Sequence, residues 1–354
     1  MEEKRRSLAP RGVSVIADWD ADGATSAAMI VYAQEYRRLY PLQGRHMVDA
    51  YPSGPRGFPD ALREACTPEC PEALVVLDIP FTERVYNSLK AMEKRCGSTR
   101  LIYIDHHYSS LYAVEKLQEL TEEVYLGHKP TAILTYNILA SLGLKRLTPR
   151  LEAFMKAVGV LEKSRKPTPG EVRIIRLAAS ISKASTVLRD KELWLRLVRW
   201  LASPLPAGTP VDMKVIRRVL EVAEKTDKEI EERAKELAFS ARRVGFIKLV
   251  DARGKWQGRG ASALASKLFK ILHQPVALLV RRDDGAELLI IRTRGVKAYR
   301  IAVGLLRQGL ADNIGGHSSL AVVKLVQGVQ LPVLEKALRR LSFEAEKESE
   351  ADIF

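Results

Sequence analysis

The feature that most constrains the fold of this 354-residue chain is a short apolar run that leads directly into three aspartates. Residues 13–16 favour a strand, Asp18, Asp20 and Asp22 follow on alternate positions, and residues 24–40 are compatible with a helix. A strand, an acidic turn and a helix in this order are typical of an open parallel sheet, whose chemistry lies at the carboxyl ends of the strands. Because carboxylates this close repel one another unless they share a cation, the stretch is a candidate metal site.

Two other interpretations of this stretch do not need a catalytic metal. An Asp-x-Asp-x-Asp-Gly run also begins the calcium loop of helix–loop–helix proteins, which requires a Glu at its twelfth position. Met29 occupies that position and a predicted strand precedes the loop, so the calcium loop is disfavoured. A solvated turn whose aspartates only cap the following helix remains open from these residues alone.

The chain continues, as far as about Ser185, with short apolar runs that alternate with helical ones. The apolar runs predict strands at 13–18, 47–51, 74–78 and 101–105, and the helical runs predict helices at 24–40, 58–65, 81–95, 131–142, 149–161 and 169–186. This alternation predicts an α/β domain with a mainly parallel sheet.

Two further predicted strands end in acidic residues. The strand at 74–78 ends in Asp78, and the strand at 101–105 ends in Asp105 and is followed by two histidines. Since the carboxyl ends of parallel strands lie along one edge of a sheet, these side chains can converge with Asp18–Asp22. Convergence of three strand ends favours the metal site over the solvated turn.

The net charge of +14 is concentrated in one segment of the chain. Between Lys145 and Arg199 there are 14 Lys and Arg but only five Asp and Glu. Such a local excess predicts a polyanionic partner, with nucleic acid as the first candidate. A generally basic, solvated surface is the alternative.

The cysteines and the apolar runs indicate in which cellular compartment the protein is expected. Cys66, Cys70 and Cys96 are too few for a disulfide framework and lack a second ligand pair for zinc, so reduced thiols in a cytoplasmic protein are expected. No signal-peptide pattern and no apolar run long enough to span a membrane is present, so no membrane partner is expected. Only three asparagines, with 28% charged residues, hint at a heat-adapted source.

The second half of the chain begins after a Pro-rich break at 203–210 and a long charged helical stretch at 211–243, which we interpret as a connector. Beyond it, strands are expected at 246–250, 276–280, 288–291 and from Leu320 onward, with helices at 261–272, 298–308 and 332–346. A turn at 313–319 is expected to lie between the last two strands. Its double glycine would let the backbone approach a ligand, but these residues alone favour a tight strand-entry turn.

The stretch from Asp18 to Ser26, followed in order by Asp78, Asp105-His106-His107 and Gly315-Gly316-His317, resembles the DHH phosphoesterase superfamily, and within it the RecJ-type nucleases. The resemblance covers nearly the whole chain. It is similar to the short archaeal type, which lacks an added nucleic-acid-binding OB domain. The resemblance implies an α/β fold in which a parallel-sheet DHH domain is joined by a helical linker to a smaller α/β DHHA1-type domain, with the active site in the cleft between them. The corresponding ranges are 1–185 for the DHH domain, 186–243 for the linker, 244–346 for the DHHA1-type domain and 347–354 for an acidic tail.

The resemblance also implies two divalent cations, with manganese preferred and magnesium as the alternative. The implied metal ligands are Asp20, Asp22, Asp78 and His106, with Glu162 and Asp18 as further candidates. Among the catalytic residues, Asp105 would orient its neighbours and His107 would face the scissile phosphate. The implied phosphate-binding residues are Gly315, Gly316 and His317, and Arg292 and Arg294 are added as phosphate clamps.

One motif departs from the family pattern. The fourth motif should fall in residues 157–163, where Lys163 stands at the expected aspartate and Glu162 precedes it. Either Glu162 replaces the aspartate after a small backbone shift, or the second cation is weakened, because an ammonium group opposes cation binding.

The predicted function is therefore a metal-dependent phosphodiesterase, an exonuclease that hydrolyses single-stranded DNA or short RNA by a two-metal mechanism. A groove between two domains suits single strands better than duplex. The fourth-motif departure keeps open a catalytically inactive RecJ-like scaffold subunit of the replicative helicase complex. A small-nucleotide phosphodiesterase or phosphatase is a third reading. Expected partners are single-stranded nucleic acid and, as further candidates, replication or repair proteins.

Overall fold

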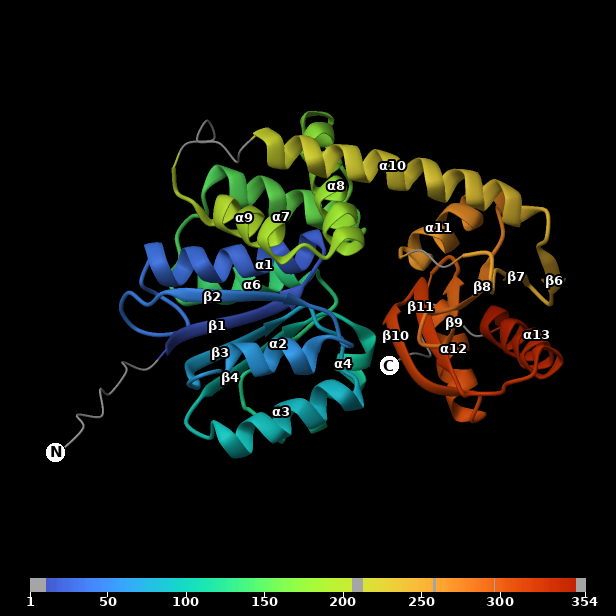
Figure 1. Cartoon of the computed structure of the whole chain (residues 1–354), viewed down its shortest axis with the longest axis horizontal. Helices are drawn as coiled ribbons and strands as arrows, with labels where there is room; N and C mark the ends of the chain where they lie inside the picture. Colours follow the sequence, from blue (N-terminus) through green and yellow to red (C-terminus); the bar gives the residue numbers. More distant parts are fainter. Residues whose placement is uncertain (1–10, 206–212, 257–258, 296, 348–354) are drawn as a thin grey trace. The chain divides into compact units, whose positions relative to one another are not determined.

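The computed structural model of this chain describes residues 11–205, 213–256, 259–295 and 297–347. These residues form two compact units, each with its own sheet (Figure 1). The first unit runs from the first described residues to His106 and from Ser110 to Leu220, and the second contains 107–109 and the described residues from Glu221 onward. The predicted α/β fold class, with a parallel sheet followed by a second α/β part, is confirmed.

The first unit is built on a five-stranded sheet in which every neighbouring pair is parallel. The spatial order is β2-β1-β3-β4-β5, so the strand order reverses beside β1, where open α/β sheets place their ligands. The four predicted strands are all present, and the three-residue β5, which is only half-buried, was not predicted. The strands are β1 (Arg11–Asp18), β2 (Val48–Ser53), β3 (Pro71–Leu77), β4 (Arg100–Asp105) and β5 (Val124–Leu126).

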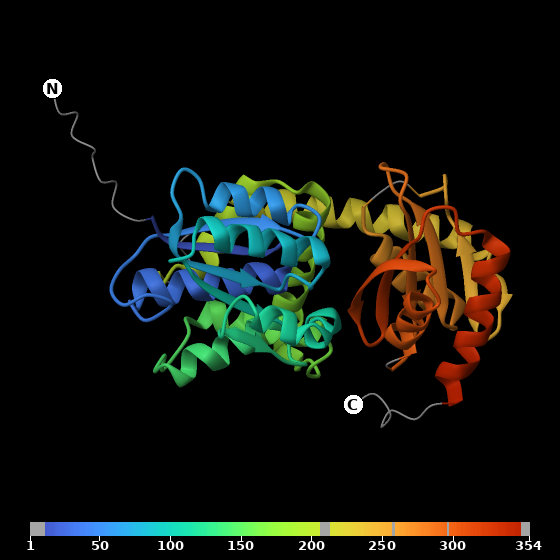
Figure 2. The ribbon, with the colours of Figure 1, turned by 90° about the horizontal axis from the view of Figure 1, so that it is seen from below.

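Helices cover both faces of this sheet (Figures 1 and 2). On one face α1 packs against α6, α7, α8 and α9, and on the other α2 packs against β1, β2 and α3. The helices are α1 (Ala21–Val31), α2 (Phe58–Ala65), α3 (Glu83–Arg95), α4 (Tyr108–Tyr112), α5 (Val114–Gln118), α6 (Thr131–Ser141), α7 (Pro149–Leu161), α8 (Val172–Leu188) and α9 (Lys191–Ala202). The helix predicted at 24–40 is instead α1 followed by a π-helical turn at Tyr32–Tyr36.

Helix α1 is the centre of this packing because all of its residues are buried. Its sequence consists largely of alanine, glycine, serine and threonine, which let neighbouring helices approach closely. A helix buried on every side cannot show the one-sided apolar stripe of a surface helix. Within the described chain, no helix combines the length and the apolarity that a membrane span requires.

The second unit contains a six-stranded sheet in the order β10-β11-β9-β8-β7-β6. Only β7 and β8 pair in parallel, and the other pairs are antiparallel. One core joins the sheet to α12 and α13, and another joins it to α11 and the second half of α10. The elements are α10 (Met213–Ala238), β6 (Arg242–Val244), β7 (Ile247–Asp251), α11 (Ala261–Leu272), β8 (Val276–Arg281), β9 (Glu287–Arg292), α12 (Lys297–Arg307), β10 (Ala311–His317), β11 (Leu320–Leu325) and α13 (Leu331–Lys347).

The start of the predicted connector at 211–212 and most of the Pro-rich break lie outside the described residues, as does the tail from 348. The described part of the connector is α10 together with the short strand β6. The domain boundaries at 185 and 243 stay predictions.

The expected turn at 313–319 is wrong, because most of it belongs to strand β10. His317 pairs with Leu320 across the sheet, so only Ser318 and Ser319 form the turn. Gly316 has φ 109°, and a Cβ there would lie 2.3 Å from the Leu320 carbonyl oxygen. Gly316 thus allows a tight hairpin in an edge strand, whereas glycines in a sequence usually indicate a turn.

The expectation of reduced thiols is also wrong for two of the three cysteines. Cys70 and Cys96 form a disulfide with their Cα atoms 5.6 Å apart, and Cys66 is a buried thiol. The pairing arises because Cys70 directly precedes β3 and Cys96 caps α3 just before the neighbouring strand β4. Intracellular proteins of hyperthermophiles also carry disulfides, so the bond does not decide the compartment.

Candidate metal centre

Three aspartates surround the junction between β1 and α1. Asp18 is the last residue of β1, and Asp20 is the N-cap of α1. Asp20 Oδ1 accepts the backbone N–H groups of Asp22 at 2.9 Å and Gly23 at 3.0 Å. Asp20 therefore does cap the helix, as one of the two alternatives proposed, but it uses only its Oδ1 oxygen to do so. Asp22 lies within the first turn of the helix and is buried, which no purely solvated turn explains.

Gly23 explains why the motif carries a glycine after its third aspartate. A Cβ at this position would lie 2.4 Å from the carbonyl oxygen and 2.7 Å from the amide nitrogen of Asp18. The first turn of α1 therefore packs directly onto the backbone at the end of β1. This close approach keeps Asp18, Asp20 and Asp22 together.

Among residues that all belong to the first unit, two overlapping groups of side chains could each hold a metal ion. Asp22, Asp78 and His106 offer ligand atoms within 4.8 Å of one another, and so do Asp18, Asp20 and Asp78. His106 Nε2 lies 3.4 Å from Asp78 Oδ1 and 3.6 Å from Asp22 Oδ2. Asp78 belongs to both groups. The residues come from the ends of β1, β3 and β4, so the predicted convergence of these strand ends is observed.

The electrostatics of the centre fit a cation. Burial raises the pKa of Asp22 well above its ordinary value, and the neighbouring charge of Asp78 raises it further. Asp20 and Glu162 act in the same direction, while His106 lowers this pKa. A divalent cation would offset this concentration of negative charge. Carboxylates with one imidazole are ligands that manganese or magnesium accepts, and no thiolate is among them.

Asp78 has an unusual backbone conformation. It follows β3 with φ 59°, in the left-handed region, and its N–H donates to the Ile104 carbonyl at 3.0 Å. Aspartate is among the few residues other than glycine that tolerate this region. Backbone strain of this kind concentrates at functional sites, where surrounding contacts maintain it.

The N-terminus of α6 contacts the same carboxylates, and sequence reasoning missed it. The backbone N–H groups of Thr131 and Ala132 donate to Asp22 Oδ2 at 2.9 Å and Oδ1 at 2.7 Å. The Thr131 hydroxyl donates to Asp78 Oδ1 at 2.9 Å. The available signal was a threonine directly after Pro130 at a predicted helix start, which by itself indicates only a helix terminus.

Asp105 is the last residue of β4, and His106 and His107 follow it directly. Asp105 is fully buried and accepts a hydrogen bond from the Ser110 hydroxyl at 2.5 Å. The Ser110 oxygen in turn accepts the Phe81 N–H at 2.8 Å. His107 directly follows His106, is half-buried, and groups with the second unit. Its orientation toward a phosphate stays a prediction.

Glu162 and Lys163 have different environments at the end of α7. Glu162 is the C-cap residue, is half-buried, and its charge contributes to the raised pKa of Asp22. Lys163 follows with φ 58° and is exposed. Of the two residues, Glu162 is thus the one whose charge affects the pKa of the buried Asp22.

The predicted phosphate-binding residues of the second unit lie at one end of its sheet. Gly315, Gly316 and His317 form the end of β10. Arg292 is the last residue of β9, and its Nη1 donates to the carbonyl and hydroxyl oxygens of Ser319 at 3.2 and 2.8 Å. Arg294 is exposed just beyond β9.

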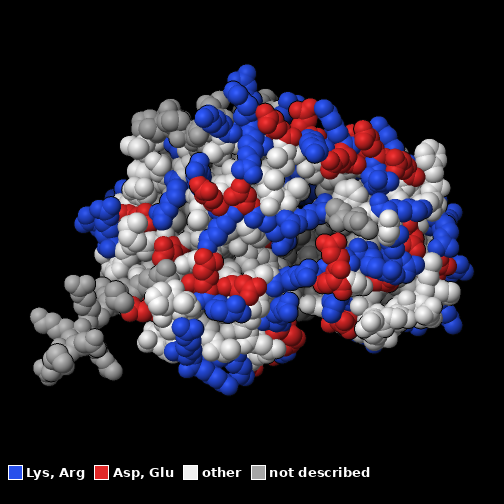
Figure 3. All heavy atoms as spheres, in the orientation of Figure 1, with Lys and Arg blue, Asp and Glu red and all other residues white. Residues whose placement is uncertain are grey.

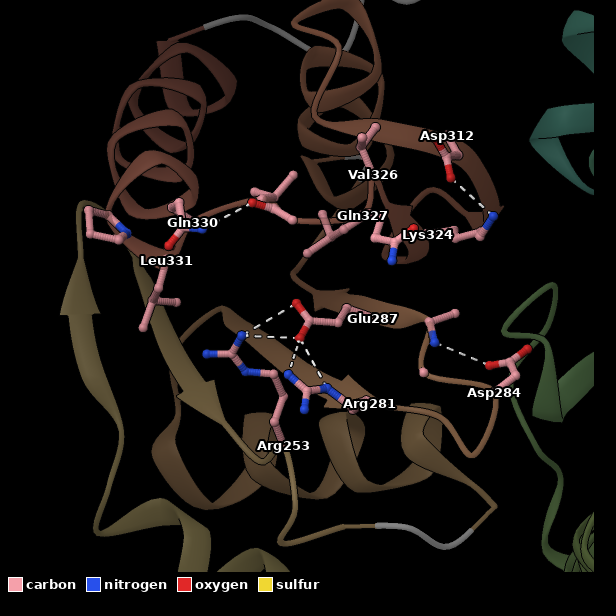
Figure 4. Close-up of a pocket in the computed structure, with 16 residues that line it drawn as sticks. Arg253, Arg281, Asp284, Glu287, Asp312, Lys324, Val326, Gln327, Gln330 and Leu331 are labelled. Atoms are coloured by element: carbon pink, nitrogen blue, oxygen red, sulfur yellow. Dashed lines mark hydrogen bonds and ion pairs between the residues drawn. The ribbon is translucent and has the colours of Figure 1, made fainter.

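A cavity of about 820 Å³ lies at the opposite end of the same sheet (Figure 4). Its charged side chains largely pair with one another. Glu287 accepts hydrogen bonds from Arg253 at 3.2 Å and Arg281 at 2.8 Å, and Lys324 pairs with Asp312 at 3.0 Å. The cavity therefore lacks the net positive charge that a phosphate site would require.

The basic segment is less uniform in space than in sequence. On the face seen in Figure 3, Lys and Arg are interspersed with Asp and Glu. Arg165 is paired with Glu171, whereas Lys166, Arg173 and Arg176 are exposed. Helix α8 contains no acidic residue.

No sequence family compared with the chain matches it, and no curated protein sequence does either. Solved structures do resemble it. RecJ from Thermus thermophilus in complex with Mn²⁺ superposes with a TM-score of 0.64 at 15% identity, over 95% of this chain and 52% of that one. An exonuclease RecJ bound to manganese gives a TM-score of 0.58 at 14% identity, over 95% and 90% of the two chains. The pGpG-specific phosphodiesterase PggH from Vibrio cholerae gives a TM-score of 0.52 at 12% identity, over 96% of this chain and 100% of that one.

The chain shares the α/β fold of these RecJ and PggH structures. The chain therefore has a RecJ-like fold, as the sequence motifs predict. The chain spans about half the length of the Thermus thermophilus RecJ. At 12–15% identity, this likeness establishes the fold alone.

Proposed function

We propose that this chain is a divalent-metal-dependent phosphodiesterase that hydrolyses single-stranded nucleic acid from an end. The observation that carries the proposal is the convergence of Asp22, Asp78 and His106 with Asp18 and Asp20 at three neighbouring strand ends. The RecJ structures that share the fold hold Mn²⁺ or Mg²⁺, which supports the same class of ion here.

In this proposal Asp22, His106 and Asp78 would hold one cation, and Asp18, Asp20 and Asp78 would hold a second. Divalent cations held by these residues would supply Lewis-acid activation of the phosphate and of the attacking water. Glu162 takes the place of the fourth-motif aspartate, because its charge already influences Asp22.

The remaining residues bind and orient the substrate. Asp105, held by the Ser110 hydroxyl, keeps the loop after β4 in place, and His107 donates to the phosphate that is attacked. Gly315, Gly316 and His317, with Arg292 and Arg294, bind a neighbouring phosphate.

Single-stranded nucleic acid is the proposed substrate because exposed cations on and near α8 can contact a phosphate backbone. A dinucleotide is the second candidate, since PggH, which matches over its full length, is named for pGpG. Replication or repair proteins remain proposed partners, and a cytoplasmic location remains a prediction.

The test is hydrolysis of end-labelled single-stranded DNA, single-stranded RNA and pGpG with Mn²⁺, beside the variant Asp20→Asn/Asp22→Asn. We expect shortening of an oligomer by the wild type and none by the variant. Cleavage of pGpG alone would assign the dinucleotide function. If the chain binds these DNA, RNA and dinucleotide substrates but cleaves none of them, it is a catalytically inactive scaffold protein and not an enzyme.

A further inference from the structure

We propose that Thr131, at the N-terminus of α6, is a positioning residue that sets the relative orientation of Asp22 and Asp78. The inference rests on the proposed metal site, which the same two carboxylates would form. It assigns a role to a residue that no motif identified. It also explains how two buried carboxylates can lie side by side before a cation binds.

The first observation concerns Asp22. Each of its oxygens accepts one backbone N–H from the first two residues of α6, at 2.9 and 2.7 Å. The first N–H groups of a helix have no partner within the helix, so they are available to a carboxylate. Helix α6 is 11 residues long, and its dipole favours negative charge at this end. Asp22 is therefore fixed in both position and rotation.

The second observation concerns Asp78 and is independent of the backbone amides. The Thr131 hydroxyl donates to Asp78 Oδ1 at 2.9 Å, and Thr131 is fully buried. One residue thus contacts both carboxylates, through its N–H on one side and its hydroxyl on the other. The same Asp78 oxygen lies 3.4 Å from His106 Nε2, so the hydroxyl also fixes the oxygen nearest to the imidazole.

These contacts counter a repulsion within the site. The carboxylates of Asp22 and Asp78 lie close together, since Asp22 Oδ2 and Asp78 Oδ1 are 3.6 and 3.4 Å from the same nitrogen, His106 Nε2. Hydrogen bonds to a charged carboxylate stabilise it, and outer partners of metal ligands affect metal affinity by about 10–100-fold. Loss of the hydroxyl should therefore weaken metal binding without removing a ligand.

The chain offers a matched control one turn further along α6. Thr135 is also fully buried, and its hydroxyl has no hydrogen-bond partner among the described residues. Thr131→Val and Thr135→Val exchange the same hydroxyl for the same methyl group in the same helix. Only the first removes a contact with a candidate ligand. Thr131→Ser retains the hydroxyl and serves as the conservative variant.

The experiment is a calorimetric titration of the full chain with Mn²⁺, together with thermal unfolding of the metal-free proteins. We expect Thr131→Val to lower the Mn²⁺ affinity by about 10–100-fold. Thr131→Ser should restore the affinity to within about threefold of wild type, and Thr135→Val should leave it unchanged. If Thr131→Val does not fold, Thr131→Ala removes the same hydroxyl with less volume, and the same comparison applies.

Two results would overturn the inference while leaving the proposed function intact. One is a Thr131→Val variant that binds Mn²⁺ as tightly as the wild type. The other is an equal loss of affinity in Thr135→Val, which would indicate a general effect of helix packing. A wild-type chain that binds no Mn²⁺ would instead contradict the proposed metal site, and the role of Thr131 with it.

Discussion

At the scale of single residues, Asp78 is the residue on which the candidate centre depends most. It belongs to both groups of possible metal ligands, accepts the Thr131 hydroxyl, and has a left-handed backbone. These properties constrain which substitution can test it. Alanine would remove the carboxylate and also add the cost of a left-handed conformation, about 1–2 kcal/mol.

Asp78→Asn is therefore the better variant. Asparagine tolerates the left-handed region and can still accept from Thr131, but it carries no charge to share between two cations. We expect the rate of Mn²⁺-dependent hydrolysis to fall by more than about 100-fold. This loss is larger than the loss expected when only a hydrogen-bond partner of a metal ligand is removed. The measurement is the initial rate on a labelled oligomer, with thermal unfolding as the control for folding. Near-wild-type turnover would rule out a shared ligand at this position.

The acidic residues of the site could be predicted from sequence because each one ends or follows an apolar run with strand character. Asp18, Asp78 and Asp105 were placed in this way. Thr131 and Ser110 could not be, because their roles depend on partners that only the fold brings near. The spacing of residues along the chain does not indicate which distant residues will become hydrogen-bond partners.

At the scale of elements, the junction of β1 and α1 depends on the absence of a side chain at Gly23. A methyl group there would overlap the Asp18 backbone, and forcing extra volume into a packed region costs about 1–3 kcal/mol. We expect Gly23→Ala to lower the free energy of unfolding by this amount, measured by urea denaturation. Gly170→Ala is the control, since a Cβ there meets no atom within 4 Å. Equal stability of the two variants would contradict the close approach.

The start of α8 predicts a dependence of stability on pH. A hydrogen bond from Arg165, with others from Thr168, lowers the pKa of Glu171 from 4.5 to about 2. Because the folded pKa is depressed, the stabilisation is complete above pH 4.5 and is lost as the pH falls toward 2. We expect the Tm difference between wild type and Glu171→Gln to narrow steadily over that range. A difference independent of pH would show that the carboxylate charge does not contribute.

Helices and strands could be predicted where the local sequence pattern agreed with the tertiary packing around them. The helices at 58–65, 149–161 and 261–272 match α2, α7 and α11. Strand β10 was missed because Gly316 allows a close hairpin contact within a strand, whereas a double glycine in a sequence usually indicates a turn. The Cys70–Cys96 pairing depends on the adjacency of β3 and β4, which the sequence order alone does not reveal.

At the scale of the whole molecule, the ordered motifs predicted the fold that the solved RecJ structures share at about 15% identity. The substrate was less predictable, because net charge indicates only a polyanionic partner. Arg165 illustrates the difference, since its charge is committed to Glu171.

The exposed cations should bind the phosphate backbone of a long substrate. We expect Lys166→Gln, Arg173→Gln and Arg176→Gln together to weaken binding of a single-stranded oligomer more than binding of a dinucleotide. The slope of log K against log salt should fall by about 2, at roughly 0.7 per lost phosphate contact. Fluorescence anisotropy over a salt series measures both quantities. An equal loss for the two ligands would assign these cations to a solvated surface.

The most direct test of the central claim is the anomalous difference density of crystals grown with Mn²⁺. We expect one peak in contact with Asp22, Asp78 and His106 and another in contact with Asp18, Asp20 and Asp78, so that Asp78 contacts both. Crystals of the Asp78→Asn variant should lose at least one of these peaks. Density at neither group, in wild-type crystals soaked with excess Mn²⁺, would contradict the assignment of a metal centre to these strand ends.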